Sequence, residues 1–191
     1  MSLVLSTSWN AFRHKNGKDM LFEISRLGFK EAELSFNLSA SMVKGIEEFL
    51  KNGPIKIASL HNFCPIPAGI SREEALPDCF AMSSTDDNTR ALSVKFAKNT
   101  IDVAQRFNAK AVVLHCGRVE IPGRTRKLIS LYMDGRKDSP EFIQLRDDMI
   151  KERESLSKPF LENTLRSLEE LNLYAEKKGI FLGVETRYYY R

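Results

Sequence analysis

Three polar side chains that could share one chemical task stand at the ends of three apolar segments. The segment AVVL (residues 111–114) is followed by His115, the segment IKIASL (55–60) by His61 and Asn62, and the segment IFLGV (180–184) by Glu185. Short runs rich in Val, Ile and Leu that stop abruptly are typical of strands buried in a parallel sheet. Because the carboxyl ends of such strands meet at one edge, where α/β enzymes place their chemistry, we expect the three side chains to converge.

Two imidazoles and one carboxylate are donors that a divalent metal ion accepts. Ligands from three separate strands would make a rigid metal site from His61, His115 and Glu185. The competing interpretation is that each side chain caps its own strand by hydrogen bonding to the backbone. No tight ligand spacing such as HExxH decides between the two.

Three further residues are candidates for contact with a substrate. Trp9 follows a short apolar strand (residues 3–6), where its ring would either stack on a sugar or base or pack as part of the core. Glu33 lies inside the predicted strand Glu31–Leu34, so its carboxylate must face the polar mouth of the fold or find a structural ion-pair partner. Asn62 leaves its strand together with His61.

Helical patterns separate the predicted strands. We expect helices over residues 17–27, from Ser39 or Ser41 to residue 50, from the Asp86–Asp87 pair onwards, and from Ser139 to residue 178, with a kink or a break at Pro159. The segment 118–135 is basic and partly irregular, typical of a solvated loop or a phosphate-binding loop. The resulting β-α alternation predicts a parallel sheet with right-handed crossovers.

The longest irregular segment, residues 62–85, follows the strand that ends at His61. It carries Pro65, Pro67, Gly69 and Pro77. Loops of this length in a compact domain are usually lids or binding loops. We therefore expect this segment to cover the site.

Composition indicates one domain over residues 1–191. The chain is 42% hydrophobic and 28% charged, and its 29 basic and 25 acidic residues are interspersed and give a formal charge of +4. This weak charge argues against nucleic acid as a partner and equally suits an anionic small substrate. With no bilayer-length apolar run, no secretory signal and three cysteines outside any CxxC pair, we expect a cytoplasmic protein with reduced thiols and no membrane contact.

The motifs at the five predicted strands resemble those of the xylose isomerase-like TIM barrels, which include sugar phosphate isomerases and epimerases and the endonuclease IV branch. The resemblance rests on the order of LSTSW, AELSF, SLHNF, VVLHCG and GVETR along nearly the whole chain. It implies that Glu185 binds a divalent metal (Mn, Mg, Co or Zn) and acts as acid and base in an epimerase. It implies that His61 and His115 are metal ligands in the endonuclease branch but line the substrate pocket in epimerases, and that Arg187 contacts a substrate oxygen or phosphate.

The sequence departs from that family in one respect. A TIM barrel has eight strands in about 250 residues, whereas the pattern predicts five strands, so the family's later aspartate, histidine and glutamate ligands have no counterpart. We expect a fragment or an incomplete barrel. Two open sheet edges invite aggregation or pairing with another chain. A homo-oligomer is therefore one expectation, and poor stability or inactivity of this polypeptide alone is another.

The function expected from this resemblance is a metal-dependent isomerase or epimerase that acts on a small-molecule sugar or sugar phosphate by proton transfer through an enediolate. Two alternatives stay open. One is an endonuclease IV-like phosphodiesterase, which would use both histidines as ligands. The other is a non-catalytic barrel binding protein that has lost the chemistry.

Overall fold

The computed structural model describes residues 3–185 of the chain, in which five strands alternate with helices. The strands are β1 (Val4–Ser6), β2 (Glu31–Leu34), β3 (Lys56–His61), β4 (Ala111–His115) and β5 (Phe181–Glu185). The helices are α1 (Gly17–Arg26), α2 (Ala40–Leu50), α3 (Asp87–Arg106), α4 (Thr125–Met133) and α5 (Pro140–Lys178). Among the described residues, no helix is long and apolar enough to cross a membrane.

The strands form one parallel sheet in the order β1-β2-β3-β4-β5. This order confirms the predicted parallel arrangement with crossover helices, and it leaves β1 and β5 at the two edges of the sheet over residues 3–185. The pairing of β2 with β3 shifts register between Ala32 and Glu33, so that Ala58 is skipped and Glu33 lies opposite Ser59.

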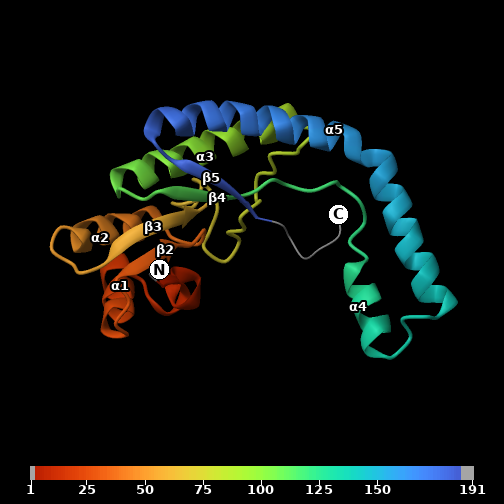
Figure 1. Cartoon of the computed structure of the whole chain (residues 1–191), viewed down its shortest axis with the longest axis horizontal. Helices are drawn as coiled ribbons and strands as arrows, with labels where there is room; N and C mark the ends of the chain where they lie inside the picture. Colours follow the sequence, from red (N-terminus) through yellow and green to blue (C-terminus); the bar gives the residue numbers. More distant parts are fainter. Residues whose placement is uncertain (1–2, 186–191) are drawn as a thin grey trace.

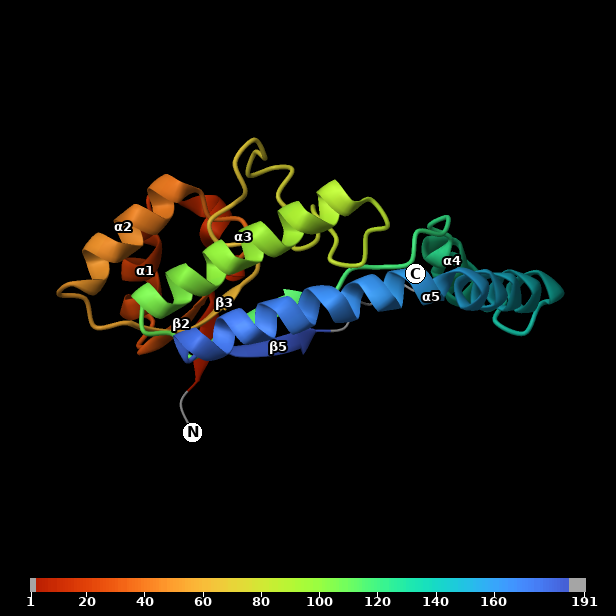
Figure 2. The ribbon, with the colours of Figure 1, turned by 90° about the horizontal axis from the view of Figure 1, so that it is seen from above.

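The two faces of the sheet differ in what covers them. Side chains such as Ala32, Leu60 and Val112 are buried on the face against which the helices pack, and they belong to the main core. In Figures 1 and 2, α3 and α5 run side by side over the strands. The residues next to these buried side chains along each strand point to the opposite face of the sheet, because side chains alternate. We call this opposite side the open face.

Helix ends follow the predicted signals. The side chains of Ser39, Asp86 and Ser139 accept hydrogen bonds from backbone amides in the first turns of α2, α3 and α5, as N-cap residues do. Gly179 ends α5 in the left-handed conformation at φ 68°. The loops that follow therefore start at defined residues, and β5 is delivered next to β4.

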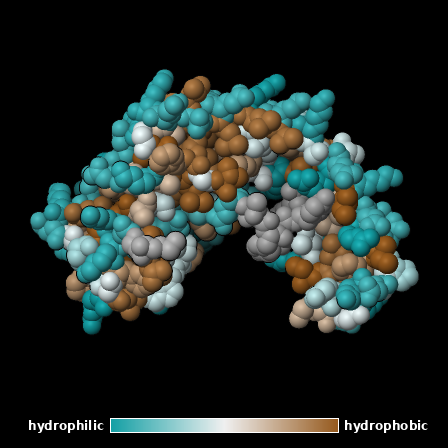
Figure 3. All heavy atoms as spheres, viewed as in Figure 1, coloured by the Kyte–Doolittle hydropathy of each residue, from teal (hydrophilic) through white to brown (hydrophobic). Residues whose placement is uncertain are grey.

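The basic segment after β4 contains a helix, α4, that the sequence pattern did not predict. Helix α5 is continuous through Pro159 over 39 residues and changes direction along its length. Its amino-terminal part and α4 project away from the sheet. Figure 3 shows apolar side chains gathered on this projection, where Tyr132 and Met133 of α4 are exposed.

The segment between β3 and α3 is tied down along its length. Phe63, Cys64 and Met82 are buried in the core. Near the carboxyl end of this segment, the Met82 carbonyl accepts a hydrogen bond from Ser167 Oγ of α5 at 3.0 Å.

Arg72 fastens the middle of the same segment. Its guanidinium donates to three backbone carbonyls, those of Asn37 at 3.0 Å, His14 at 3.1 Å and Ala11 at 2.6 Å. These carbonyls belong to the loops after β1 and β2. Arg72 thus joins three of the loops at the carboxyl end of the sheet.

Candidate metal and substrate site

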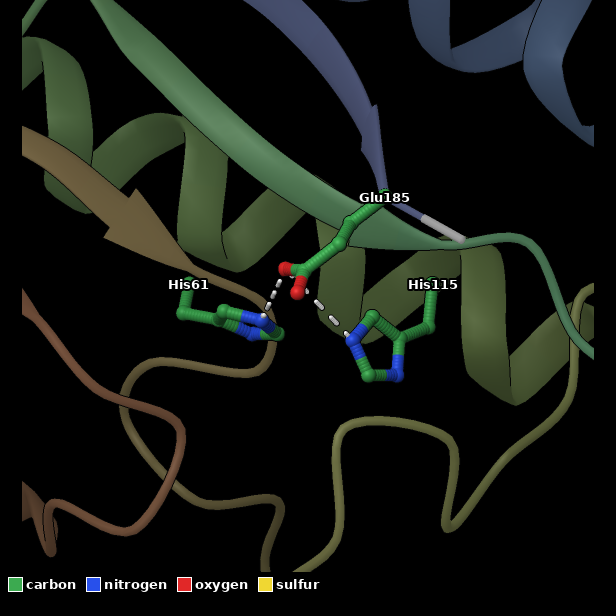
Figure 4. Close-up of side chains that lie close together, drawn as sticks. All are labelled: His61, His115 and Glu185. Carbon is green, nitrogen blue, oxygen red and sulfur yellow. Dashed lines mark hydrogen bonds and ion pairs between the residues drawn. The ribbon is translucent and has the colours of Figure 1, made fainter. Parts of the chain in front are cut away.

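The structure brings His61, His115 and Glu185 together at the carboxyl ends of β3, β4 and β5. His115 and Glu185 are opposite each other in the β4–β5 register, and His61 is opposite Val113. All three side chains therefore lie on the open face. Figure 4 shows the Glu185 carboxylate between the two imidazole rings.

The distances within this triad are short. Glu185 Oε2 lies 3.2 Å from His61 Nε2 and 3.7 Å from His115 Nε2. The imidazole rings stand edge to face, with their centroids 4.9 Å apart. One donor atom from each residue lies within 4.8 Å of the other two, an arrangement suited to a metal ion.

The donor set fits a divalent metal in its chemistry and spacing. Ligand bonds of about 2.0–2.1 Å in a tetrahedron place neighbouring donor atoms about 3.3–3.4 Å apart. The two carboxylate–imidazole distances of 3.2 and 3.7 Å lie on either side of that value. His61 Nδ1 lies 3.1 Å from the Asn62 carbonyl. An Nδ1–H donated to that carbonyl leaves the Nε2 lone pair facing Glu185, the tautomer that a metal requires.

Exposure divides the triad into two kinds of side chain. The two imidazoles are each 12% exposed, whereas the Glu185 side chain is 53% exposed. The Phe36 ring stands edge-on to His61 at a centroid distance of 5.5 Å. The imidazoles are thus held in place by packing, and the carboxylate is the member that a substrate can reach.

Cys116 follows His115 directly, yet it adds no metal donor to the triad. Successive side chains on a strand point to opposite faces, so Cys116 starts the turn away from the open face. Burial raises the pKa of its thiol. This burial disfavours the thiolate, which is the form that binds a metal.

The rim next to His115 is built by a close approach of two loops. Gly117 has φ +94°, and its α-carbon lies against Ser83. Ser83 Oγ donates to the Arg118 carbonyl at 2.7 Å and accepts from the Arg118 amide at 2.9 Å. Arg118 also pairs with Asp78 at 3.0 Å. The segment after β3 is thereby attached to the loop after β4.

Glu33 lies on the open face, as one of the two predicted alternatives required. Its Oε2 accepts a hydrogen bond from Ser59 Oγ at 2.7 Å, and both residues are half-buried. Ser59 was not predicted as a site residue. The signal that could have identified it is a polar residue two positions before His61, because residues two apart on a strand share a face. Strict alternation would also place Ile57 on that face, and the register shift that skips Ala58 returns Ile57 to the core.

The other predicted substrate-binding residues lie elsewhere. Trp9 is half-exposed, and the Arg13 guanidinium lies 4.1 Å from its ring centroid. Asn62 is fully buried, and its Oδ1 accepts from Thr100 of α3 at 3.0 Å, so its side chain faces the helices rather than the triad. Arg187 falls outside the described residues.

Comparison with known proteins gives matches in structure only. No protein-family model matches the sequence, and no curated protein matches it. Among solved structures, a D-tagatose 3-epimerase-like protein aligns with a TM-score of 0.61 and 18% identity, over 97% of this chain and 53% of its own length. A 3-keto-D-glucoside 4-epimerase from E. coli aligns with a TM-score of 0.63 and 13% identity, over 100% of this chain and 58% of its own.

A D-allulose 3-epimerase from Methylomonas sp., solved in complex with D-allulose, aligns with a TM-score of 0.61 and 15% identity. The alignment covers 100% of this chain and 53% of that protein. The chain thus spans about half the length of the TIM barrels that it matches. These matches confirm the predicted fold class, and the five-stranded sheet is consistent with an incomplete barrel.

Proposed function

We propose that this chain, which has the xylose isomerase-like TIM-barrel fold, is a metal-dependent isomerase or epimerase that acts on a sugar or sugar phosphate by proton transfer through an enediolate. The observation that carries the proposal is the convergence of His61, His115 and Glu185 at the ends of three strands. The names of the structural neighbours, which are sugar epimerases, support the substrate class. We also propose that residues 1–191 form part of a single barrel domain.

In this proposal the metal would be held by the two Nε2 atoms and the Glu185 carboxylate. Such an ion supplies Lewis-acid stabilisation of negative charge on a carbonyl oxygen. The donor set of two imidazoles and a carboxylate suits zinc, cobalt and manganese, and it suits magnesium less well because magnesium prefers oxygen ligands.

Glu185 would remove the proton from the carbon beside the substrate carbonyl. Its carboxylate is the most exposed group of the triad, whereas the imidazoles are packed beneath it. The two imidazoles are each 12% exposed, and the Phe36 ring packs against that of His61. Among the described residues, Glu185 is the one carboxylate in the triad, so these residues account for proton removal, the first half of an epimerisation.

The test is deuterium uptake by a ketose. The chain loaded with Co²⁺, Mn²⁺ or Zn²⁺ is incubated with a panel of ketoses in D₂O, and exchange at the carbon next to the carbonyl is followed by NMR. We expect uptake without full turnover, and we expect Glu185→Gln to abolish it. Glu170→Gln is the matched control, because Glu170 is an exposed acid of α5 paired with Lys98. A folded, metal-loaded protein that exchanges no deuterium in any ketose would contradict the proposal.

The same triad would also serve a second candidate, phosphodiester cleavage at abasic DNA, in which both histidines would likewise be metal ligands. The weak net charge of +4 argues against it, since duplex binding needs a substantial basic surface. Cleavage of an abasic oligonucleotide by the zinc-loaded chain, without deuterium uptake by ketoses, would favour this function instead. A non-catalytic binding protein would show neither reaction, no stoichiometric metal and no effect of Glu185→Gln on ligand binding.

A further inference from the structure

A row of three polar side chains crosses the open face beside the triad. Ser6 of β1 is opposite Glu33 of β2, and Glu33 is opposite Ser59 of β3. The flanking residues Leu5 and Leu60 pack toward the core, so the row belongs to the face that the helices do not cover. His61 is the next residue after Ser59 on that face. The row and the triad therefore form one continuous polar strip.

The register gives this strip a direction. Adjacent strands lie about 4.7–4.9 Å apart, so the row spans the three strands on the β1 side, while the triad occupies β3, β4 and β5. A ligand with its carbonyl end at Glu185 would extend across the strands toward Glu33. An open-chain polyol offers a hydroxyl on each carbon along such a path.

The open face is also uncrowded on the β5 side of the triad, away from the row. Gly183 is opposite Val113 and lies between Phe181 and Glu185 on the same face of β5. A Cβ built on Gly183 would meet only the Val112 carbonyl, at 4.0 Å. The position is therefore empty of protein atoms among the described residues, and a larger side chain there would occupy the open face without a clash.

The chemistry of the row favours hydroxyl donors over anions. A carboxylate is an acceptor with about four lone-pair sites, and Ser59 Oγ uses one oxygen of Glu33 at 2.7 Å. Hydroxyl groups can donate to the remaining sites, whereas a phosphate brings negative charge against the carboxylate and is repelled.

The arginines of the surrounding loops are already engaged. Arg13 pairs with Glu23 at 3.1 Å, Arg118 pairs with Asp78 at 3.0 Å, and Arg72 donates to three backbone carbonyls. A phosphate at the end of the strip near Glu33 would therefore compete with existing partners for each of these cations.

We propose that Ser6, Glu33 and Ser59 bind the hydroxyl chain of a neutral, non-phosphorylated sugar and that Glu33 selects against the corresponding sugar phosphate. This inference rests on the proposed function, because it places the sugar carbonyl at the triad. It assigns Glu33 as a specificity residue and Ser59 as the residue that positions the Glu33 carboxylate.

The test compares a neutral ketose with its phosphate on the Co²⁺-loaded chain. Dissociation constants for D-tagatose and D-tagatose 6-phosphate are measured by calorimetry or ligand-observed NMR. We expect the neutral sugar to bind at least about tenfold more tightly, equivalent to about 1.4 kcal/mol. Glu33→Gln should reduce this preference at least severalfold, and Ser59→Ala should reduce it to a smaller extent. Glu47→Gln, an exposed acid of α2, is the matched control.

A second variant tests the position of the ligand. Gly183→Val places a bulky side chain on β5, on the side of the triad away from the row, so it should change neither the affinity for D-tagatose nor the Co²⁺ absorption spectrum. Equal affinity for the two sugars, or unchanged affinities in folded Glu33→Gln and Ser59→Ala variants, would overturn the inference.

The outcomes separate this inference from the proposed function. Preference for the neutral sugar that depends on Glu33, without deuterium uptake, would support the binding row and contradict catalysis. Deuterium uptake that depends on Glu185, with equal affinity for both sugars, would support the function and refute the row.

Discussion

Replacing Gly117 with alanine tests whether the contact between the loops after β3 and β4 stabilises the rim of the site. A Cβ at Gly117 would lie 2.3 Å from Ser83 Oγ, 2.8 Å from Ser83 Cβ and 3.0 Å from the Ser83 nitrogen. These distances are too short, so the methyl group must displace Ser83. The two hydrogen bonds between Ser83 Oγ and the backbone of Arg118 would break with that displacement.

The expected loss of stability has two parts. Holding alanine in the left-handed conformation costs about 1–2 kcal/mol, and losing two hydrogen bonds costs about 0.5–1.5 kcal/mol each. Gly28→Ala isolates the first part, because Gly28 has φ +90° but no heavy atom within 4 Å of its built Cβ. Gly117→Ala should therefore destabilise the chain by about 1–3 kcal/mol more than Gly28→Ala.

Urea unfolding followed by circular dichroism measures this difference, provided that both variants keep the m-value of the parent chain. A Co²⁺ titration of each variant reports whether the loss extends to His115, which lies two residues before Gly117. We expect weaker Co²⁺ binding in Gly117→Ala and unchanged binding in Gly28→Ala. Equal destabilisation within about 0.5 kcal/mol would refute the reasoning, because the two lost hydrogen bonds should make the difference at least about 1 kcal/mol.

Four further predictions concern the metal, the core, pH and assembly. His115→Gln should weaken Co²⁺ binding at least about tenfold in an absorption titration, whereas His14→Gln, on a histidine paired with a glutamate of α1, should not. Asn62→Ala should lower the free energy of unfolding by about 1–3 kcal/mol through its lost Thr100 contact but leave Co²⁺ binding unchanged. Burial raises the pKa of the Cys64 thiol from 9.0 to about 12, so the folded chain keeps a proton that the unfolded chain releases. Stability should therefore fall between those pH values by up to about 1.4 kcal/mol per pH unit. Urea unfolding at pH 8 and 10 should show this loss, and Cys64→Ala should reduce it without removing it, because burial also raises the thiol pKa of Cys79 and Cys116. Light scattering after size exclusion should show assemblies or a poorly stable species, because both edge strands offer unpaired backbone groups; a monodisperse monomer with full turnover would contradict this.

Much of the fold could be predicted because local signals and tertiary packing agree. Serine and aspartate side chains accept hydrogen bonds from the free backbone amides at the start of a helix. Three predicted N-cap residues do so here: Ser39, Asp86 and Ser139. Gly179 could be placed at the end of α5 because glycine adopts the left-handed conformation most readily. The convergence of His61, His115 and Glu185 follows from strand parity and parallel pairing alone.

The position of Asn62 shows where such reasoning fails. The sequence pattern placed the end of β3 at Leu60, so that His61 and Asn62 would leave the strand together. The structure extends β3 to His61, and the Asn62 amide still donates to the Val113 carbonyl at 2.9 Å. Because the extended backbone continues to Asn62, its side chain points to the face opposite that of His61. It is therefore buried against Thr100 on the helix side of the sheet.

Helix α4 was missed for a different reason. Its N-cap, Arg124, makes no capping hydrogen bond through its side chain, and Leu131 is its only buried residue. Neither a start signal nor a wide apolar stripe marks it in the sequence. Packing against α5 supports it instead, together with an ion pair from Arg124 to Glu152. Interactions between segments far apart in sequence leave no local pattern.

The three hydrogen bonds of Arg72 make its peptide bond a reporter of loop opening. Trypsin cleaves after an arginine only when that side chain enters the protease's own pocket. The Arg72 guanidinium cannot do so while it holds the carbonyls of Ala11, His14 and Asn37. Nicking at this position therefore requires the Arg72 side chain to leave these carbonyls, so it would track how often the segment after β3 separates from the loops after β1 and β2, and a ligand that binds across them would slow it.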